Sequence, residues 1–174
     1  YIDDAQILSD MEKAREICDI LIVSMHWGDE NTQTPNSEQY RLAKLIANAG
    51  ADVILGHHSH TLQPIEWIER DGGGKTLCIY SLGNFVSGMA RPVNQVGGFL
   101  SFHIRGDGNG SLEIAEPSFT PTVFYYGMDW YDTHLYFLEN YTDDMAARHG
   151  VQISGYYMSV ADARAFVTNV MDSE

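Results

Sequence analysis

Two apolar runs, Ile20-Leu21-Ile22-Val23-Ser24-Met25-His26 and Asp52-Val53-Ile54-Leu55, decide the fold of this chain. Continuous apolar runs, in contrast to alternating ones, are typical of strands that are covered on both faces of a parallel sheet. Between the runs, Ser37 can cap a helix whose apolar residues recur at helical spacing up to Ala49. Residues 20–55 therefore predict a βαβ unit in which two adjacent parallel strands are joined by a right-handed crossover helix.

Further elements are predicted on either side of this unit. Ser9 and Glu12 have the spacing of a capping box, which predicts a short helix over residues 10–18. Residues 65–69 alternate between apolar and polar side chains, and residues 76–80 return as the second strand of a β-hairpin.

The second half of the chain predicts another hairpin and a helical tail. The hairpin strands are expected over residues 98–104 and 111–115, joined by the glycine-rich residues 106–110. Residues 119–141 are rich in aromatic side chains. The helices predicted in the tail cover about residues 132–149 and 159–171. The predicted fold class is α/β: a βαβ unit, then β-hairpins, then an α-helical tail.

Composition narrows the classes of partner. The 174 residues include 10 Lys and Arg against 24 Asp and Glu, so the formal net charge is −14, and 44% of the residues are hydrophobic. Such a chain can bury a sizeable core, and its acidic field repels nucleic-acid phosphates and anionic lipid. We therefore expect no nucleic acid as a partner. The same field attracts cations.

The two cysteines, Cys18 and Cys78, both have apolar neighbours in the sequence. Buried small hydrophobic residues are the favoured interpretation, with a disulfide as the alternative. They do not identify the redox compartment.

Four of the seven histidines stand where the two predicted parallel strands end. His26 closes the first run, and His57, His58 and His60 follow the second. Ligands of open α/β sheets bind outside the carboxyl ends of the strands, and neighbouring strands are only about 4.8 Å apart. In an extended segment His58 and His60 point to the same side, while Ser59 points away. A single histidine here would be interpreted as a surface loop residue, but several converging ones favour a metal site.

Four blocks of sequence in order carry a family resemblance. They are Ser24-Met25-His26-Trp27-Gly28-Asp29-Glu30, Ala49-Gly50-Ala51-Asp52-Val53-Ile54-Leu55-Gly56-His57-His58-Ser59-His60, Gln63-Pro64-Ile65-Glu66 and Tyr80-Ser81-Leu82-Gly83-Asn84-Phe85-Val86. With these blocks the chain resembles the bacterial capsule-synthesis CapA (poly-γ-glutamate synthesis) family, within the calcineurin-like metallophosphatase superfamily. The resemblance covers roughly residues 10–116. It implies the C-terminal part of an α/β/β/α sandwich over residues 1–116, followed by a separate tail over residues 117–174.

The resemblance assigns metal-binding roles to three histidines. His26 corresponds to the lone histidine that ligates one metal ion, and His58 and His60 correspond to the pair that divides between two ions. The cofactors that it implies are two divalent ions of the Mn, Fe or Zn type in the intact domain.

Other residues of the same blocks are candidates for catalysis or substrate contact. His57 is a candidate acid/base or substrate-facing residue, with a packed loop histidine as the alternative. Glu30 is a candidate catalytic residue that supports the site or contacts substrate. Asn84, together with Trp27, is expected to contact substrate or to support the metal ligands, although a turn-forming Gly-Asn explains Asn84 equally well.

The superfamily site also uses Asp-x-His, Gly-Asp and Gly-Asn-His blocks upstream, and none of these precedes His26. The chain, which starts at Tyr1, is therefore expected to correspond to the C-terminal half of a domain in a longer protein, with the N-terminal half and its acidic ligands missing. We expect this fragment to be weakly active or inactive and to bind metal weakly. We also expect self-association across an open strand edge, with coverage by residues 119–141 as the alternative.

Two functions of different classes follow from the resemblance. In one, the parent protein is a metal-dependent hydrolase of a phosphoester or related bond, so its substrate is a phosphoester or a polyanionic polymer. In the other, it is a non-catalytic binding or assembly component of polyanionic capsule synthesis and export. The resemblance further implies an extracytoplasmic or cell-surface location, with a membrane anchor in the parent protein.

Overall fold

The computed structural model describes residues 2–106, 108 and 110–171, and it confirms the α/β class, with two β-sheets and four α-helices among these residues. The helices are α1 (Asp4–Arg15), α2 (Ser37–Asn48), α3 (Asp143–Ala146) and α4 (Val160–Met171), with the 3-10 helices η1 (Pro92–Gln95), η2 (Leu138–Asn140) and η3 (Gly150–Ser154). The strands are β1 (Ile22–His26), β2 (Val53–His57), β3 (Leu62–Glu69), β4 (Lys75–Leu82), β5 (Val96–Gly106), β6 (Leu112–Tyr126) and β7 (Thr133–Phe137).

The first sheet contains the predicted βαβ unit. Its strand order is β1-β2-β4-β3. β1 and β2 are parallel, with Ile22 opposite Val53 and His26 opposite His57, which confirms the prediction for residues 20–55. β4 is parallel to β2, and β3 pairs antiparallel with β4 as the predicted hairpin. The carboxyl ends of β1 and β2 therefore lie side by side.

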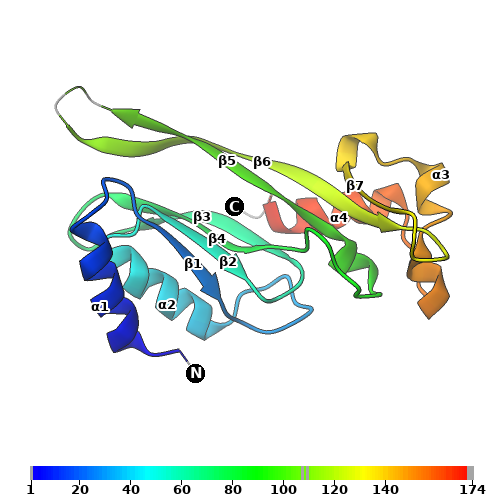
Figure 1. Cartoon of the computed structure of the whole chain (residues 1–174), viewed down its shortest axis with the longest axis horizontal. Helices are drawn as coiled ribbons and strands as arrows, with labels where there is room; N and C mark the ends of the chain where they lie inside the picture. The colour runs from blue at the N-terminus through cyan, green and yellow to red at the C-terminus, as the bar shows by residue number, and fades with distance from the viewer. Residues whose placement is uncertain (1, 107, 109, 172–174) are drawn as a thin grey trace.

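Three layers enclose the core of this part of the molecule (Figure 1). α1 and α2 cover one face of the first sheet, where Leu42 and Ile46 pack with Ile54. The hairpin β5–β6 covers the opposite face, where Leu100 and Phe102 pack near Val53 and Leu77. Burial on both faces explains why the strand sequences are continuous apolar runs.

Both N-terminal helices begin earlier than the sequence predicted. α1 begins at Asp4, because the Asp3 carboxylate accepts hydrogen bonds from the backbone N–H groups of Ala5 and Gln6. The expected capping box at Ser9 is wrong, since that residue lies inside the helix. α2 is capped by Asn36, which forms a reciprocal capping box with Gln39, and not by Ser37.

The second sheet has the strand order β5-β6-β7 and is antiparallel. β5 and β6 form the hairpin predicted at residues 98–104 and 111–115, and both strands are longer than predicted. Residues 107 and 109 of the expected turn lie outside the described residues. β6 continues through residue 116, where we expected one unit to end. The division at that residue stays a prediction.

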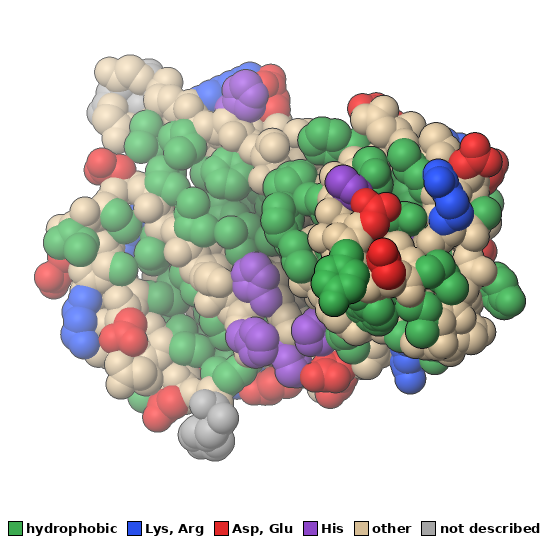
Figure 2. Space-filling model, turned by 45° about the vertical axis from the view of Figure 1, so that its right-hand side comes forward, with side chains coloured by type: hydrophobic (Ala, Val, Ile, Leu, Met, Phe, Trp, Pro, Cys, Tyr) green, Lys and Arg blue, Asp and Glu red, His purple; other side chains and the backbone are tan. Residues whose placement is uncertain are grey.

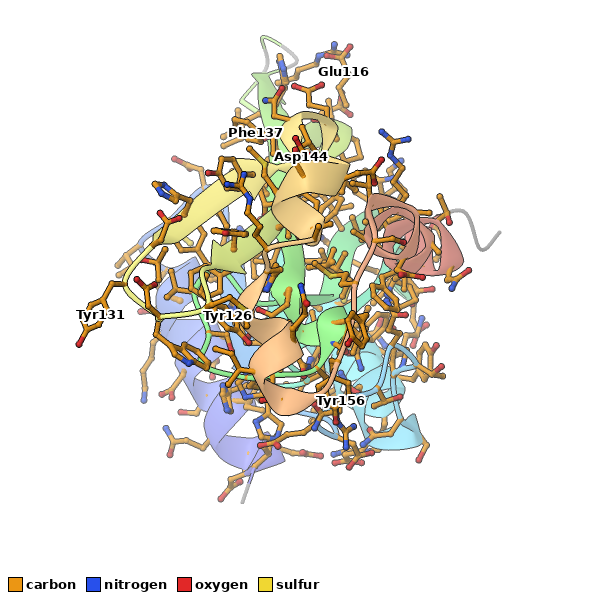
Figure 3. All side chains as sticks on the ribbon, turned by 90° about the vertical axis from the view of Figure 1, so that its right-hand side faces the viewer. Glu116, Tyr126, Tyr131, Phe137, Asp144 and Tyr156 are labelled. Atoms are coloured by element: carbon orange, nitrogen blue, oxygen red, sulfur yellow. The ribbon has the colours of Figure 1, made fainter. Side chains whose placement is uncertain are left out.

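The helix predicted over residues 132–149 is wrong. This segment instead contains β7, the 3-10 helix η2 and the single-turn helix α3. Residues 133–137 pair with Thr122–Tyr126 of β6, so the free edge of a strand distant in sequence overrides the local helical spacing. Figure 3 shows Tyr131 projecting from the turn before β7, whereas Tyr126 lies inside the molecule.

The predicted last helix is confirmed as α4, which begins one residue later than expected. Ala163 and Val170 of α4 are buried in the tail core, where the partly buried Phe166 and Val167 also pack. None of the described helices is long and apolar enough to cross a membrane. Both cysteines are free thiols, as predicted, and Cys78 is fully buried.

Candidate functional site at the carboxyl ends of β1 and β2

The predicted histidines come together where β1 and β2 end. His26 and His57 are paired across the two strands, and the ring centroids of His26 and His58 are 4.5 Å apart. The centroids of His58 and His60 are 6.3 Å apart. Figure 2 shows histidine side chains gathered on one face of the molecule, beside acidic side chains. The rings of His26 and His60 thus both lie near the ring of His58, and the prediction that the three imidazoles point into one pocket stays a prediction.

The backbone that carries two of these rings is strained. His58 has a φ of 95° and His60 a φ of 58°, and the neighbouring Asn31 has a φ of 62°. Residues with side chains rarely adopt positive φ, and such strain of about 1–3 kcal/mol per residue persists only where the surroundings enforce it. Holding His58 and His60 in this arrangement therefore lowers the stability of the folded state.

Two buried asparagines hold His60. Its Nδ1 lies 2.9 Å from Oδ1 of Asn84, and its backbone carbonyl accepts hydrogen bonds from Nδ2 of Asn84 (3.3 Å) and Nδ2 of Asn94 (2.9 Å). The Asn84 amide also donates to the Asn94 carbonyl at 2.9 Å, which closes the loop between the two residues. The contact predicted for Asn84 is thus to a histidine of the site.

The loop after β1 is fastened beside the histidine segment. The Asn31 N–H donates to the Ser59 carbonyl at 2.7 Å, and the Thr61 hydroxyl donates to the Thr32 carbonyl at 2.6 Å. Glu30 lies on this loop with an exposed side chain that has no hydrogen bond or ion pair within the described part of the chain. Its role as a catalytic or supporting residue stays a prediction.

His57 differs from its neighbours in its electrostatics. Its ring is half-buried, and burial, followed by the proximity of His26, lowers the pKa of His57 below its ordinary value. A lowered pKa keeps an imidazole neutral at neutral pH, where it can accept a proton. The acid/base role of His57 stays a prediction.

Trp27 lies beneath the site and not at its surface. Its side chain is buried in the core, its indole N–H donates to the Tyr80 carbonyl at 2.9 Å, and its ring stacks on Tyr80. Gly56 permits this close approach, since a Cβ there would lie 1.9 Å from the Tyr80 carbonyl oxygen and 2.7 Å from the Trp27 indole nitrogen. In this structure Trp27 therefore supports the strand ends and does not face a substrate.

The histidines fit only part of a metal site. Two or three imidazoles in one place match the ligand preference of divalent transition metals. Within residues 2–106, 108 and 110–171, however, no three His, Cys, Asp or Glu side chains form a group that could hold one ion together. A complete site on these histidines would need ligands beyond those that the described side chains bring together.

Asn94 is the site residue that the sequence did not reveal. It is fully buried, and it contacts a histidine 34 positions away along the chain. The sequence around Asn94, from Pro92 to Gln95, is typical of an ordinary turn. The one sequence feature that hints at the role of Asn94 is weak: it is a second asparagine, ten residues after Asn84.

Comparisons with known proteins find similar chains in other bacteria. The chain is 37% identical over 104 residues to the "PGA biosynthesis protein CapA" of Bacillus subtilis, an alignment that covers 60% of this chain and 26% of that protein. It is 33% identical over 112 residues to the "Capsule biosynthesis protein CapA" of Bacillus anthracis, covering 62% and 26%. A "Probable polyglutamine synthesis accessory protein" of Mycobacterium tuberculosis is 36% identical over 98 residues, covering 56% and 22%.

The chain thus spans about a quarter of the length of these curated relatives. The model of one protein family, described as "Bacterial capsule synthesis protein PGA_cap", matches residues 2–89. Those residues are half of the chain and include the four strand-end histidines and Asn84. The chain therefore belongs to the bacterial capsule synthesis protein (PGA_cap) family.

Proposed function

We propose that this chain contributes the histidine ligands of a divalent-metal site, and that the intact protein uses that site to hydrolyse a phosphoester or a related bond. The observation that carries the proposal is the convergence of His26, His58 and His60 at the carboxyl ends of two parallel strands. The relatives' names concern PGA biosynthesis and capsule biosynthesis, so the proposed substrate is a phosphoester or an anionic polymer of that process.

Each residue has a distinct proposed part. His26, His58 and His60 would bind divalent ions of the Mn, Fe or Zn type, two in the intact domain, and the remaining ligands would come from acidic groups outside the described set. A bound divalent ion would supply the acidity that makes water a nucleophile at neutral pH. His57 would accept or return a proton as a neutral base, and Glu30 would contact the substrate or a ligand.

The proposal is tested with metal binding and hydrolysis on this chain and on the full-length protein. Calorimetry with Zn²⁺ and Mn²⁺ is expected to give binding that His58→Asn weakens at least about tenfold. His103→Asn is the matched control, because His103 is an exposed histidine on β5, away from the strand ends. Hydrolysis of a chromogenic phosphomonoester is expected only in the full-length protein and only with metal. Binding that survives replacement of His26, His58 and His60 together would overturn the proposal.

The second candidate function is a non-catalytic binding or assembly role, and one observation favours it. Among the described strands, β1 is at the edge of its sheet, next to an apolar groove that Ile7, Met11 and Val23 help to line. An open edge is a template for pairing with another chain. We propose that the chain self-associates at this edge. The parent protein would then act in capsule assembly at the cell surface, held there by an anchor elsewhere in its sequence.

Sedimentation velocity tests the assembly role. The wild-type chain is expected to associate as its concentration rises, and Ile22→Lys on the exposed edge is expected to prevent this. Ile104→Lys is the control, since Ile104 is similarly exposed on β5. A wild-type chain that remains monomeric at every concentration would contradict self-association. Fractionation of cells that express the parent protein tests the cell-surface location.

A further inference from the structure

The hydrogen bonds around Asn84 determine the orientation of its amide. The Asn84 Nδ2 position faces two backbone carbonyls, those of His60 and Asn94, at 3.3 and 2.9 Å. Carbonyl oxygens only accept hydrogen bonds, so the donor end of the amide must face them. The acceptor oxygen Oδ1 therefore has to be the atom that lies 2.9 Å from Nδ1 of His60.

This orientation decides which nitrogen of His60 carries the proton. Because Oδ1 of Asn84 can only accept, the Nδ1 of His60 must be the donor. In the neutral ring the other nitrogen, Nε2, then has a free lone pair. A lone pair on Nε2 is what a metal ion or a proton of the substrate requires from this imidazole.

Asn94 acts on the backbone of the same residue. Its Nδ2 donates to the His60 carbonyl at 2.9 Å, where the chain has a positive φ of 58°. Its own oxygen, Oδ1, is buried and has no partner within the described part of the chain. A buried acceptor without a partner costs about 1–3 kcal/mol, which is difficult to explain if Asn94 serves stability alone.

We propose that Asn84 and Asn94 are positioning residues that hold His60 with Nδ1 protonated and Nε2 available, an inference that rests on the proposed metal-binding function of His60. The two asparagines flank residues 85–93, a segment that includes the start of η1, and their mutual hydrogen bond at 2.9 Å closes it. The loop and the histidine are therefore one hydrogen-bonded unit. Neither asparagine needs to touch the metal or the substrate.

The primary test reads the tautomer directly in the metal-free chain. ¹⁵N chemical shifts of the imidazole, measured with the ring neutral, are expected to show His60 protonated at Nδ1. Asn84→Asp loses the two N–H groups that donate to the His60 and Asn94 carbonyls but keeps the acceptor for Nδ1 of His60, so it should preserve this tautomer. Asn84→Leu removes the acceptor as well and should shift the population toward Nε2–H. Asn140→Ala, a change at an exposed asparagine of η2, should have no effect.

Zn²⁺ binding gives a second readout. Asn84→Leu is expected to lower the affinity about ten- to a hundredfold, and Asn84→Asp to retain it. Asn94→Ala is expected to lower the affinity and to speed amide exchange in residues 85–93. Circular dichroism and thermal unfolding of each variant verify that the chain is folded.

The outcomes separate this inference from the proposed function. If His60 is protonated at Nε2 in the wild type, or if Asn84→Leu changes neither tautomer nor affinity, the positioning role is wrong even where His60→Asn abolishes metal binding. If the tautomer follows Asn84 as expected but the wild type binds no metal, the positioning role stands and the proposed metal function fails.

Discussion

The histidine in the tail core and the histidine at the strand ends use their ring nitrogens differently. His149 is fully buried; its Nε2 lies 3.0 Å from the Phe124 carbonyl, and its Nδ1 accepts a hydrogen bond from the Val151 N–H at 3.2 Å. Both nitrogens are thus used by the fold. His60 is only partly buried, and among the residues that the structure describes only Asn84 contacts a ring nitrogen of His60, at Nδ1. Of the two histidines, His60 is therefore the one whose ring can bind a metal ion or a substrate.

The surroundings of the two rings also differ: one lies in a packed core and the other in a strained segment beside other histidines. His149 is enclosed by aromatic rings, with ring centroids of Tyr126 and Tyr125 at 4.8 and 5.3 Å, so it is part of a packed core. His58 and His60 have positive φ values and lie beside other histidines, so they cost stability. We therefore expect substitution of His149 to lower the stability of the fold much more than substitution of His58 or His60 does.

Removing His149 is expected to have the largest effect. His149→Ala removes the imidazole that bonds to the Phe124 carbonyl and to the Val151 N–H, and it opens a cavity among the tyrosines. We expect a loss of about 3 kcal/mol in the free energy of unfolding, measured by urea denaturation. His60→Ala is the comparison, with an expected loss below about 1 kcal/mol. Equal losses for the two variants would contradict the distinction.

The pH dependence of stability is the next largest effect. Burial lowers the pKa of His149 below its ordinary value of about 6.5, because the folded state disfavours the charged ring. Below that pH the unfolded chain binds a proton that the folded chain does not, so stability decreases as the pH falls. The slope is at most about 1.4 kcal/mol per pH unit for this histidine.

Urea denaturation between about pH 7.5 and about pH 5, which is about one unit above and about 1.5 units below the ordinary pKa of histidine, measures that slope. His149→Gln is expected to flatten it. The pKa of His57 is also lowered by burial, so it adds a contribution of the same sign that His57→Gln isolates. A His149→Gln variant with the same pH dependence as the wild type would show that His149 is not held neutral in the folded state.

The contrast between the two regions also explains what the sequence could predict. The βαβ unit was predictable because its signals are local: two apolar runs and a helix at 3.6-residue spacing. The strand β7 was not, because it depends on the free edge of β6. Trp27 follows His26 in a strand-like segment, so alternation alone should have placed its side chain on the opposite face, in the core.

The candidate site divides in the same way. The meeting of the histidines followed from strand order and the rule for parallel sheets. The role of Asn94 did not, because it arises from a single hydrogen bond across 34 positions in a loop without periodic pattern. Sequence reasoning thus reached the histidines at the strand ends and missed an asparagine that holds one of them.

The smallest expected effect is a gain in the free energy of unfolding, and it tests the contrast between the two kinds of histidine most directly. His58 has a φ of 95°, so His58→Gly removes backbone strain, and after the entropy cost of glycine in the unfolded chain a net gain of about 0.5–1 kcal/mol remains. His60→Gly is the matched control: it relieves similar strain but loses the hydrogen bond to Asn84, so no net gain is expected. Urea denaturation measures both, and Zn²⁺ titration is expected to show weaker binding in the stabilised His58→Gly. If His58→Gly destabilises the chain instead, then His58 contributes to the fold as His149 does, and the division between structural and presented histidines fails at that position.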